Sequence, residues 1–514
     1  MSLRSDIKKV LFIFPPSTMQ VDWEAMATTP MGIAYLAAVA REAGYEVTCL
    51  DAVSEDVYQV TPVGERMCRH GLAYDQIMGR VRELKPDVVG LSCIFSNQWP
   101  AVEELSRRLK AEDPDLIVVT GGAHPSFLSE QCMQRAPLDF IVKGEAEHSF
   151  LDLLGRLKAG RPVDQVDGLV WRDGDRVRMN EKTGFIQDLD SLPFPAHDLL
   201  PTEKYFKLAL PMAFNFMDPR CVPVVTSRGC PCRCTFCSST HLWGYNYRTR
   251  SAANVLKELD WLVERFGVRE IKFQDDNLTV NRNRAKELFQ GMIDRPYHLH
   301  WNTPNGIAVW TLDAELLRLM RGSGCFEITM AVESGNQEVL SRIIKKPLKL
   351  DKAREVSRQA REAGIARGAY FIIGLPGETR AQIMDTVRFE RELKLDFNAV
   401  FIYNPLPGSA LFDQCLEKGY ITVENFFEAG NNYAVSVYNT DEWKAQELES
   451  IQRWEYFRHY FTFFRNPRWF FRRYYNIIRY RPRFIEFFIS RNLYILKLKL
   501  SGASSAGAAP APGC

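Results

Sequence analysis

The chain has 514 residues, 46% of them hydrophobic and 25% charged, a composition typical of globular proteins of about two to four domains. It excludes a disordered chain, a collagen-like repeat and a protein with many membrane spans. The net charge of +2 is unevenly distributed, because residues 453–514 carry 12 basic and 2 acidic side chains. We therefore treat the C-terminal segment as a separate electrostatic unit.

Residues 1–160 alternate short apolar runs with stretches of helical periodicity, which is typical of a parallel sheet flanked by helices. A Rossmann-like, doubly wound domain of this kind binds its ligand at the carboxyl ends of its strands. Residues 161–220 are predicted to form a connector. The predicted strands are 10–14, 46–51, 88–92, 116–120 and 140–142, and the predicted helices are 32–43, 74–84 and 100–111.

A second series of strands and helices begins at residue 221. Six such units predict a partial (βα)6 barrel of the TIM type over residues 221–410, so the fold class is α/β in both domains. A helical, basic and aromatic extension at 411–500 and a disordered tail at 501–514 complete the predicted organisation. The predicted barrel strands are 223–226, 270–274, 299–303, 326–332, 368–373 and 399–403.

Four of the 12 cysteines lie close together, directly after the first predicted barrel strand. Cys230, Cys234 and Cys237 form a C-x3-C-x2-C pattern, which lets three thiolates of one loop bind one [4Fe–4S] cluster and leaves the fourth iron open to a ligand. Cys232 is an additional thiol, and we expect crowding between its neighbours to keep it off the cluster. The alternative is a structural zinc site, but the second pair of ligands that zinc needs is not evident in the sequence.

With this loop the chain resembles the radical S-adenosylmethionine (SAM) enzymes, whose signature it matches at all three ligand positions. The resemblance implies SAM contacts after the second, fourth and fifth barrel strands, for its amino group, its ribose and carboxylate, and its adenine. Any one of these segments is also explained by an ordinary turn or cap, so their order behind the cysteine loop carries the prediction. The residues concerned are Gln274, Asp275 and Asp276, then Glu333 and Ser334, then Gly374 and Gly377.

The first domain is similar to cobalamin-binding domains, because a serine ends its third strand and two glycines end its fourth. The family's Asp-x-His-x-x-Gly motif is absent after the first strand, so the resemblance implies a cobalt without a histidine ligand. NAD binding is the competing use, but there is no G-x-G-x-x-G motif. The residues that the resemblance places at cobalamin are Pro15, Pro16, Ser92, Gly121, Gly122, His124, Gly144 and Glu145, although His124 could equally be an ordinary loop histidine.

Over about residues 8–410 the chain resembles the subfamily that joins a cobalamin domain to a radical SAM barrel. The resemblance implies an enzyme that methylates an unactivated carbon with a [4Fe–4S] cluster, SAM and cobalamin, and that receives electrons from a flavodoxin- or ferredoxin-type protein. Hopanoid C-3 methylases are the most similar in plan, which predicts an apolar or lipid substrate. The alternatives are a tetrapyrrole methylase or oxidative cyclase, a natural-product methylase and, outside enzymes, a cobalamin or redox sensor.

Residues 454–494 contain 17 aromatic residues, interrupted by arginines too often to span a bilayer. Three interpretations remain open: helices packed on the barrel, a peripheral membrane contact through residues 453–500, and an RNA-binding segment, which is the least favoured. The N-terminal residues show no signal-peptide core. We therefore expect a cytoplasmic protein, with contact at the inner face of the membrane as the option that the extension adds.

Overall fold

The computed structural model describes residues 6–20, 25–63, 67–211, 215–423, 438–459 and 467–481. The chain divides into two compact units. The first comprises residues 1–186, 191–214 and 476–514, and the second comprises residues 187–190 and 215–475. Most of the predicted connector therefore belongs to the first unit, and most of the predicted extension belongs to the barrel unit.

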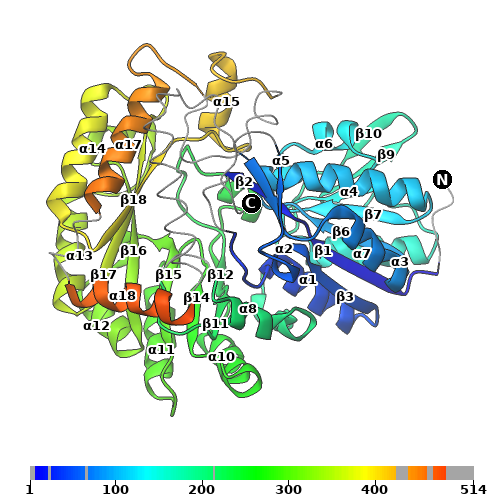
Figure 1. Ribbon diagram of the computed structural model, residues 1–514, viewed down its shortest axis with the longest axis horizontal. Helices are drawn as coiled ribbons and strands as arrows, with labels where there is room; N and C mark the ends of the chain where they lie inside the picture. Colours follow the sequence, from blue (N-terminus) through cyan, green and yellow to red (C-terminus); the bar gives the residue numbers. More distant parts are fainter. Residues whose placement is uncertain are drawn as a thin grey trace. The chain divides into compact units, whose positions relative to one another are not determined.

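The first unit is built on a seven-stranded sheet with the order β10-β9-β8-β7-β6-β1-β3 (Figure 1). The five strands from β8 to β3 are parallel, and the β9–β10 hairpin extends the sheet in antiparallel pairing. The order reverses at β1, which lies between β3 and β6, so the predicted doubly wound fold is confirmed. The strands are β1 (Lys9–Phe14), β3 (Glu46–Asp51), β6 (Val88–Ser92), β7 (Ile117–Gly121), β8 (Phe140–Val142), β9 (Leu169–Asp173) and β10 (Arg176–Met179).

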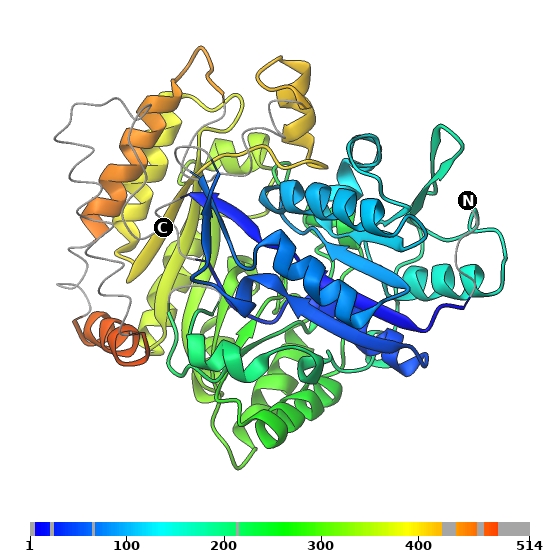
Figure 2. The ribbon, with the colours of Figure 1, turned by 45° about the vertical axis from the view of Figure 1, so that its right-hand side comes forward.

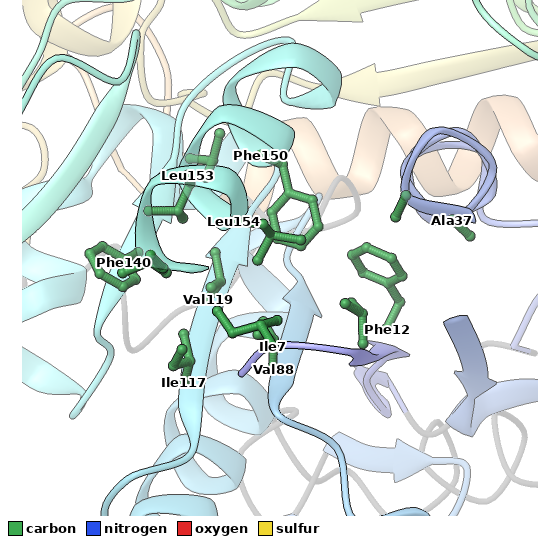
Figure 3. Packing of buried hydrophobic residues seen from close by; sticks show 14 of the residues in the cluster. Ile7, Phe12, Ala37, Val88, Ile117, Val119, Phe140, Phe150, Leu153 and Leu154 are labelled. Carbon is green, nitrogen blue, oxygen red and sulfur yellow. The ribbon is translucent and has the colours of Figure 1, made fainter. Parts of the chain in front are cut away.

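The core of this unit lies between the sheet and its helices. In Figure 3, Phe12 and Val119 of the strands face Phe150 and Leu154 of α7, and the rings of Phe12 and Phe150 are 5.4 Å apart between centroids. Apolar residues spaced three and four apart give α7 this buried face. The helices are α1 (Met31–Glu42), α2 (Ala52–Glu55), α3 (Tyr74–Leu84), α4 (Trp99–Glu112), α5 (Ala123–Phe127), α6 (Ser129–Arg135), α7 (Glu147–Lys158) and α8 (Thr202–Leu208).

A small antiparallel sheet follows β1, in segments for which no strand was predicted from the sequence. It consists of β2 (Ser17–Gln20), β5 (Met67–His70) and β4 (Val60–Pro62), in that order. The structure therefore places a short strand where cobalamin domains with the histidine motif carry that motif.

The second unit contains a six-stranded parallel sheet whose order follows the chain, as expected for a partial barrel. Helices cover its outer face (Figures 1 and 2). The strands are β11 (Cys221–Val224), β14 (Glu270–Phe273), β15 (His300–Ile307), β16 (Cys325–Glu333), β17 (Ala366–Ile373) and β18 (Phe397–Ile402). The helices are α10 (Ala252–Phe266), α11 (Arg282–Ile293), α12 (Ala314–Gly322), α13 (Leu350–Glu362) and α14 (Arg380–Leu393).

Three shorter features complete the barrel unit. Strands β12 (Ser227–Arg228) and β13 (Arg248–Thr249) pair at the two ends of the cysteine loop, which also carries α9 (Ser239–Trp243). One π-helical turn, Val339–Ile343, follows β16.

The described part of the extension consists of α15 (Ala410–Glu417), α17 (Ala445–His459) and α18 (Pro467–Tyr480). Helix α17, orange in Figure 2, packs beside β18, and the Gln452 side-chain amide donates to the Val400 carbonyl at 2.7 Å. Glu455 on the same helix is buried and pairs with Arg391 of α14. The interpretation of the extension as barrel-packing helices is therefore confirmed for α17. No helix within the described ranges is long and apolar enough to cross a membrane.

Candidate active site

The cysteine loop is held on two sides by the rest of the barrel unit. The backbone amide of Thr235 donates to Ile344 O at 3.0 Å, and its hydroxyl donates to Ile343 O at 2.6 Å. On the other side, the amide of Leu411 donates to Thr235 O at 3.0 Å. Gly229 opens the loop with a φ of +83°, and a Cβ there would lie 2.4 Å from Asn246 O, so only glycine fits.

The three predicted ligands differ from the fourth cysteine in exposure. Cys230, Cys234 and Cys237 are half-buried, whereas Cys232 is buried. A hydrogen bond from Cys232 lowers the pKa of the Cys230 thiol to about 7, while burial raises the pKa of Cys234 to about 11. A thiol whose pKa is near neutral ionises readily to the thiolate that iron binds.

This donor set fits a [4Fe–4S] cluster. Among the described residues no three His, Cys, Asp or Glu side chains converge on one point, as a single bound metal ion would require. A cubane needs no such convergence, because each thiolate binds a different iron. Cys230, Cys234 and Cys237 would hold the cluster, and the exclusion of Cys232 stays a prediction that its burial supports.

The two carboxylates after β14 have different surroundings. Asp275 is buried and accepts hydrogen bonds from the amide and hydroxyl of Thr226, at 3.1 and 2.7 Å, and from the hydroxyl of Ser227. Asp276 is exposed and accepts a hydrogen bond from the hydroxyl of Ser239. Asp275 therefore fixes the strand end that leads into the cysteine loop, and Asp276 is the carboxylate available to a ligand. Gln274 lies beside them, and its carbonyl accepts from the Asn305 amide at 2.8 Å.

A buried ion pair lies next to the cysteine loop. Lys346 Nζ is 2.9 Å from Glu333 Oε1, and both side chains are less than 10% exposed. Glu333 has a φ of +70°, a conformation that non-glycine residues rarely adopt. The Lys346 ammonium opposes the burial that raises the pKa of Cys234. Lys346 could not be predicted from the sequence as a site residue, because it reaches this place only through the π-helical turn after β16.

The segment after Glu333 is packed on α14. The hydroxyl of Ser334 is buried and lies 3.1 Å from Thr386 Oγ1, and it also accepts from the amide of Asn336 at 3.1 Å. A Cβ on Gly335 would lie 2.4 Å from Phe389 Cβ. The structure thus shows a packing role for Ser334, and its predicted contact with SAM stays a prediction.

The glycine loop after β17 is closed by its own glutamate. Glu378 Oε2 accepts from the amides of Gly374 at 2.8 Å and Leu375 at 3.0 Å. Tyr438 Oη donates to Gly374 O at 2.6 Å, and Trp443 Nε1 donates to Glu378 O at 3.1 Å. Tyr438 and Trp443 of the extension therefore hold this loop in place, which could not be predicted from the sequence. No atom outside its immediate neighbours lies within 4 Å of the place that a Cβ on Gly377 would take, so a ligand can approach this residue.

Part of the inner side of strands β16 to β18 is apolar and only partly covered. Ala331, Tyr370 and Ala399 lie opposite one another across the three strands and keep partial exposure, as does Phe401. The rings of Tyr370 and Phe401 are 5.5 Å apart. The alternating residues, such as Met330, Phe371 and Val400, are buried on the helix-covered side. We call Ala331, Tyr370, Ala399 and Phe401 the inner face.

Asn404 follows β18 at the carboxyl end of the barrel strands. Its side chain is 3% exposed, and within the described residues neither its amide nitrogen nor its amide oxygen has a hydrogen-bond partner. A buried amide without partners is costly, so we expect a water or a ligand to pair with it. Nothing in the sequence marks this residue as part of a site, because an asparagine before a proline such as Pro405 is typical of a turn.

In the first unit, the predicted cobalamin residues gather at the ends of neighbouring strands. Ser92 of β6 pairs with Gly121 of β7, and the amide of Cys93 donates to Gly121 O at 2.8 Å. Gly122 has a φ of +111°, and a Cβ there would lie 2.4 Å from Cys93 O. Gly144 follows β8 and donates its amide to Ser126 Oγ at 3.0 Å. Gly122 is therefore required for the close approach of these two strand ends, and the contact of these residues with cobalamin stays a prediction.

His124 and Glu145 are packed inside the first unit. His124 Nδ1 lies 2.9 Å from Ser96 Oγ, its ring is 5.3 Å from that of Trp99, and burial lowers its pKa to about 3. Glu145 Oε2 accepts from the amide of Ile186 at 2.9 Å. The structure therefore assigns both side chains packing contacts within the unit, and their contact with cobalamin stays a prediction. Pro15 and Pro16 connect β1 to β2 and are buried.

Comparisons with known proteins agree with both domains. The B12 binding domain model matches residues 25–154, and the Radical SAM superfamily model matches residues 224–389. The cytidylyl-2-hydroxyethylphosphonate methyltransferase of Streptomyces wedmorensis is 34% identical, covering 81% of this chain and 83% of its own. An anaerobic magnesium-protoporphyrin IX monomethyl ester cyclase of Rubrivivax gelatinosus is 28% identical, covering 86% of this chain and 75% of its own. The hopanoid C-3 methylase of Methylococcus capsulatus is 25% identical, covering 69% of this chain and 63% of its own.

Among solved structures, the radical SAM methyltransferase TsrM of Kitasatospora setae, with cobalamin and a [4Fe–4S] cluster bound, superposes with a TM-score of 0.63 at 18% identity, covering 80% of this chain and 78% of its own. This likeness confirms the fold. The match at 34% identity over most of both chains, with the two domain models in the predicted order, confirms the family and the prediction of an enzyme. The chain belongs to the cobalamin-dependent radical SAM methyltransferases, whose cofactors are a [4Fe–4S] cluster, SAM and cobalamin.

Proposed function

We propose that this enzyme methylates an unactivated carbon of a substrate whose reacting part is apolar and lies against the inner face. The half-exposed, uncharged surface formed by Ala331, Tyr370, Ala399 and Phe401 carries this proposal. Apolar walls with few polar groups are typical of sites that bind apolar ligands and exclude water from reactive species. The cofactors supply the radical and the methyl group.

The chain's own residues orient the reactants. Asp276 is exposed beside the cysteine loop and can hold the amino group of SAM by a charge-assisted hydrogen bond. Asn404 offers one donor and one acceptor at the end of β18. Tyr370 Oη donates to Pro304 O, and burial raises the pKa of this phenol to about 12, so it stays neutral and adds no charge to the inner face.

The uncharged side chains of the inner face support an apolar substrate as the first candidate. An apolar polycyclic lipid, as in the hopanoid prediction, can lie against Tyr370 and Phe401 without desolvating a charge. The second candidate is an anionic nucleotide–phosphonate conjugate, which is favoured by the 34% identity to a cytidylyl-2-hydroxyethylphosphonate methyltransferase. The third is a tetrapyrrole, which is favoured by the match to a cyclase.

Anaerobic reconstitution with iron, sulfide and hydroxocobalamin tests the proposal. The reduced enzyme would be supplied with SAM and, separately, with a hopanoid, with cytidylyl-2-hydroxyethylphosphonate and with magnesium-protoporphyrin IX monomethyl ester. We expect 5′-deoxyadenosine, S-adenosylhomocysteine and a methylated product with the hopanoid. A methylated phosphonate would replace the apolar substrate by the second candidate, and 5′-deoxyadenosine without S-adenosylhomocysteine would replace methyl transfer by cyclisation or rearrangement.

Variants of the inner face link the activity to this surface. Phe401→Ala removes an aromatic ring from the inner face and should raise KM for an apolar substrate more than it lowers kcat. Phe371→Leu is the matched control, because Phe371 lies on the helix-covered face of the same sheet. Equal effects of the two changes on KM would contradict substrate binding at the inner face.

A further inference from the structure

Helix α18, labelled in Figure 1, exposes three large apolar side chains. Phe471, Tyr475 and Ile478 are 64%, 59% and 48% exposed. Their spacing of four and then three residues places them on one side of the helix. Asn476 and Ile477 are only 7% and 3% exposed, so the helix is anchored by a different side.

Positive charges border this exposed face. Arg472 and Arg479 are exposed and lie seven residues apart, so both line one flank of this face, about 100° around the helix from Phe471 and Ile478. Helix α18 contains four arginines and no acidic residue, and residues 456–514 contain 11 basic side chains against the single acidic Glu486. A binding partner that complements this face should therefore carry negative charge.

We propose that the exposed face of α18, formed by Phe471, Arg472, Tyr475, Ile478 and Arg479, docks on an anionic lipid bilayer. Aromatic and aliphatic side chains that enter the interface, flanked by arginines that meet lipid phosphates, are the features of helices that lie in the plane of a membrane surface. An RNA would use the arginines and the rings but would leave Ile478 without a role. This docking is independent of the substrate proposed above.

Helix α17 provides a matched comparison. It exposes Trp454 and Phe457 by 56% and 52%, with their rings 5.8 Å apart, so it presents aromatic surface as α18 does. Its 15 residues, however, carry three glutamates and two arginines, so the helix is slightly negative. If charge and apolar surface act together, as the proposal requires, α18 and not α17 is the one of these two helices that binds an anionic membrane.

Co-sedimentation of the full chain with sucrose-loaded vesicles tests the proposal. We expect binding to phosphatidylcholine vesicles that contain phosphatidylglycerol, no binding to pure phosphatidylcholine vesicles, and weaker binding as salt rises. Phe471→Ser with Ile478→Ser, and separately Arg472→Gln with Arg479→Gln, should each weaken binding by about tenfold or more. Trp454→Ser with Phe457→Ser should bind as the unchanged protein does.

Any of the following outcomes overturns the proposal. Failure to bind anionic vesicles, or equal binding to both kinds of vesicle, removes the charge argument. Unchanged binding by the Phe471/Ile478 variant shows that the apolar face does not enter the bilayer. Preferential binding of a single-stranded RNA, lost in the arginine variant and kept in the Phe471/Ile478 variant, assigns the surface to nucleic acid instead. All four exposed positions can be changed without opening the core, and circular dichroism verifies the fold of each variant.

Discussion

The neighbouring carboxylates Asp275 and Asp276 provide a sharp test of how the cluster loop is built. Asp275 accepts three hydrogen bonds from Thr226 and Ser227, whereas Asp276 is exposed and bonded only to the Ser239 hydroxyl among the hydrogen bonds described. Asp275→Asn should therefore loosen the loop before any ligand binds. Asp276→Asn should leave the loop intact and weaken the binding of SAM.

The magnitude follows from the charge that the amide removes. All three bonds end on Oδ1 of Asp275, so an asparagine can keep them, but they become bonds to a neutral oxygen. A hydrogen bond to a charged group contributes about 1.5–3 kcal/mol and one between neutral groups about 0.5–1.5 kcal/mol, so weakening three bonds costs about 3 kcal/mol in Asp275→Asn. Because 1.4 kcal/mol corresponds to about a factor of ten, local opening at Thr226 and Ser227 should become about a hundredfold more frequent.

Hydrogen exchange measured by mass spectrometry on the cofactor-free chain detects this opening in the peptide around residues 225–230. We expect faster exchange there in Asp275→Asn and unchanged exchange in Asp276→Asn. Titration with SAM after cluster reconstitution should show the converse, with lower affinity in Asp276→Asn. The reasoning is refuted if the two variants exchange alike, or if Asp275→Asn exchanges as slowly as the unchanged protein.

Three further predictions follow from the same region. Cys234→Ala should lose the visible absorbance of the reconstituted cluster and Cys232→Ala should keep it; loss in both would make Cys232 a ligand. Lys346→Met leaves Glu333 buried without its partner and should destabilise the apo protein to urea by about 3 kcal/mol, with recovery in Lys346→Met/Glu333→Gln; no recovery would contradict the pairing. Burial raises the pKa of Glu378 to about 8, so its folded form binds the proton more tightly than its unfolded form, and stability to urea should fall as pH rises from about 4.5 to 8. Glu378→Gln should remove that slope, and an unaltered slope would locate it elsewhere.

Buried parallel strands could be predicted well from the sequence. The bounds of β3, β6 and β8 agree with the prediction. Strands β6 and β8 are buried, mainly apolar runs between turn residues, which leave little choice of structure. The small sheet of β2, β4 and β5 could not be predicted. Its strands have three or four residues with no apolar pattern, and their pairing joins segments about 50 residues apart.

The site residues likewise divide into those that a local sequence pattern identifies and those that only tertiary packing brings together. The spacing of Cys230, Cys234 and Cys237 is local, so the sequence alone indicates their common role. Lys346, Tyr438 and Asn404 reach the site through tertiary packing, and each has an ordinary sequence context. The support of the Gly374 loop by Tyr438 and Trp443 likewise depends on tertiary contacts that no spacing reveals.

The cluster loop is attached to the barrel unit at three points, and this arrangement lets the protein set the positions of the thiols before SAM binds. Asp275 holds Thr226 before the loop, the π-helical turn holds Thr235 beside Cys234, and Leu411 holds the other side of Thr235. Preorganised ligands of this kind retain a metal centre longer than mobile ones.

Thr235 is the residue at which two of these attachments meet. Thr235→Val removes only the hydroxyl bond to Ile343 O, worth about 1 kcal/mol, and should speed the loss of iron to a chelator about fivefold. Thr235→Ser keeps the hydroxyl and should lose iron at the original rate. If both variants lose iron alike, the side-chain bond contributes nothing, and the backbone bonds of Thr235 alone position Cys234.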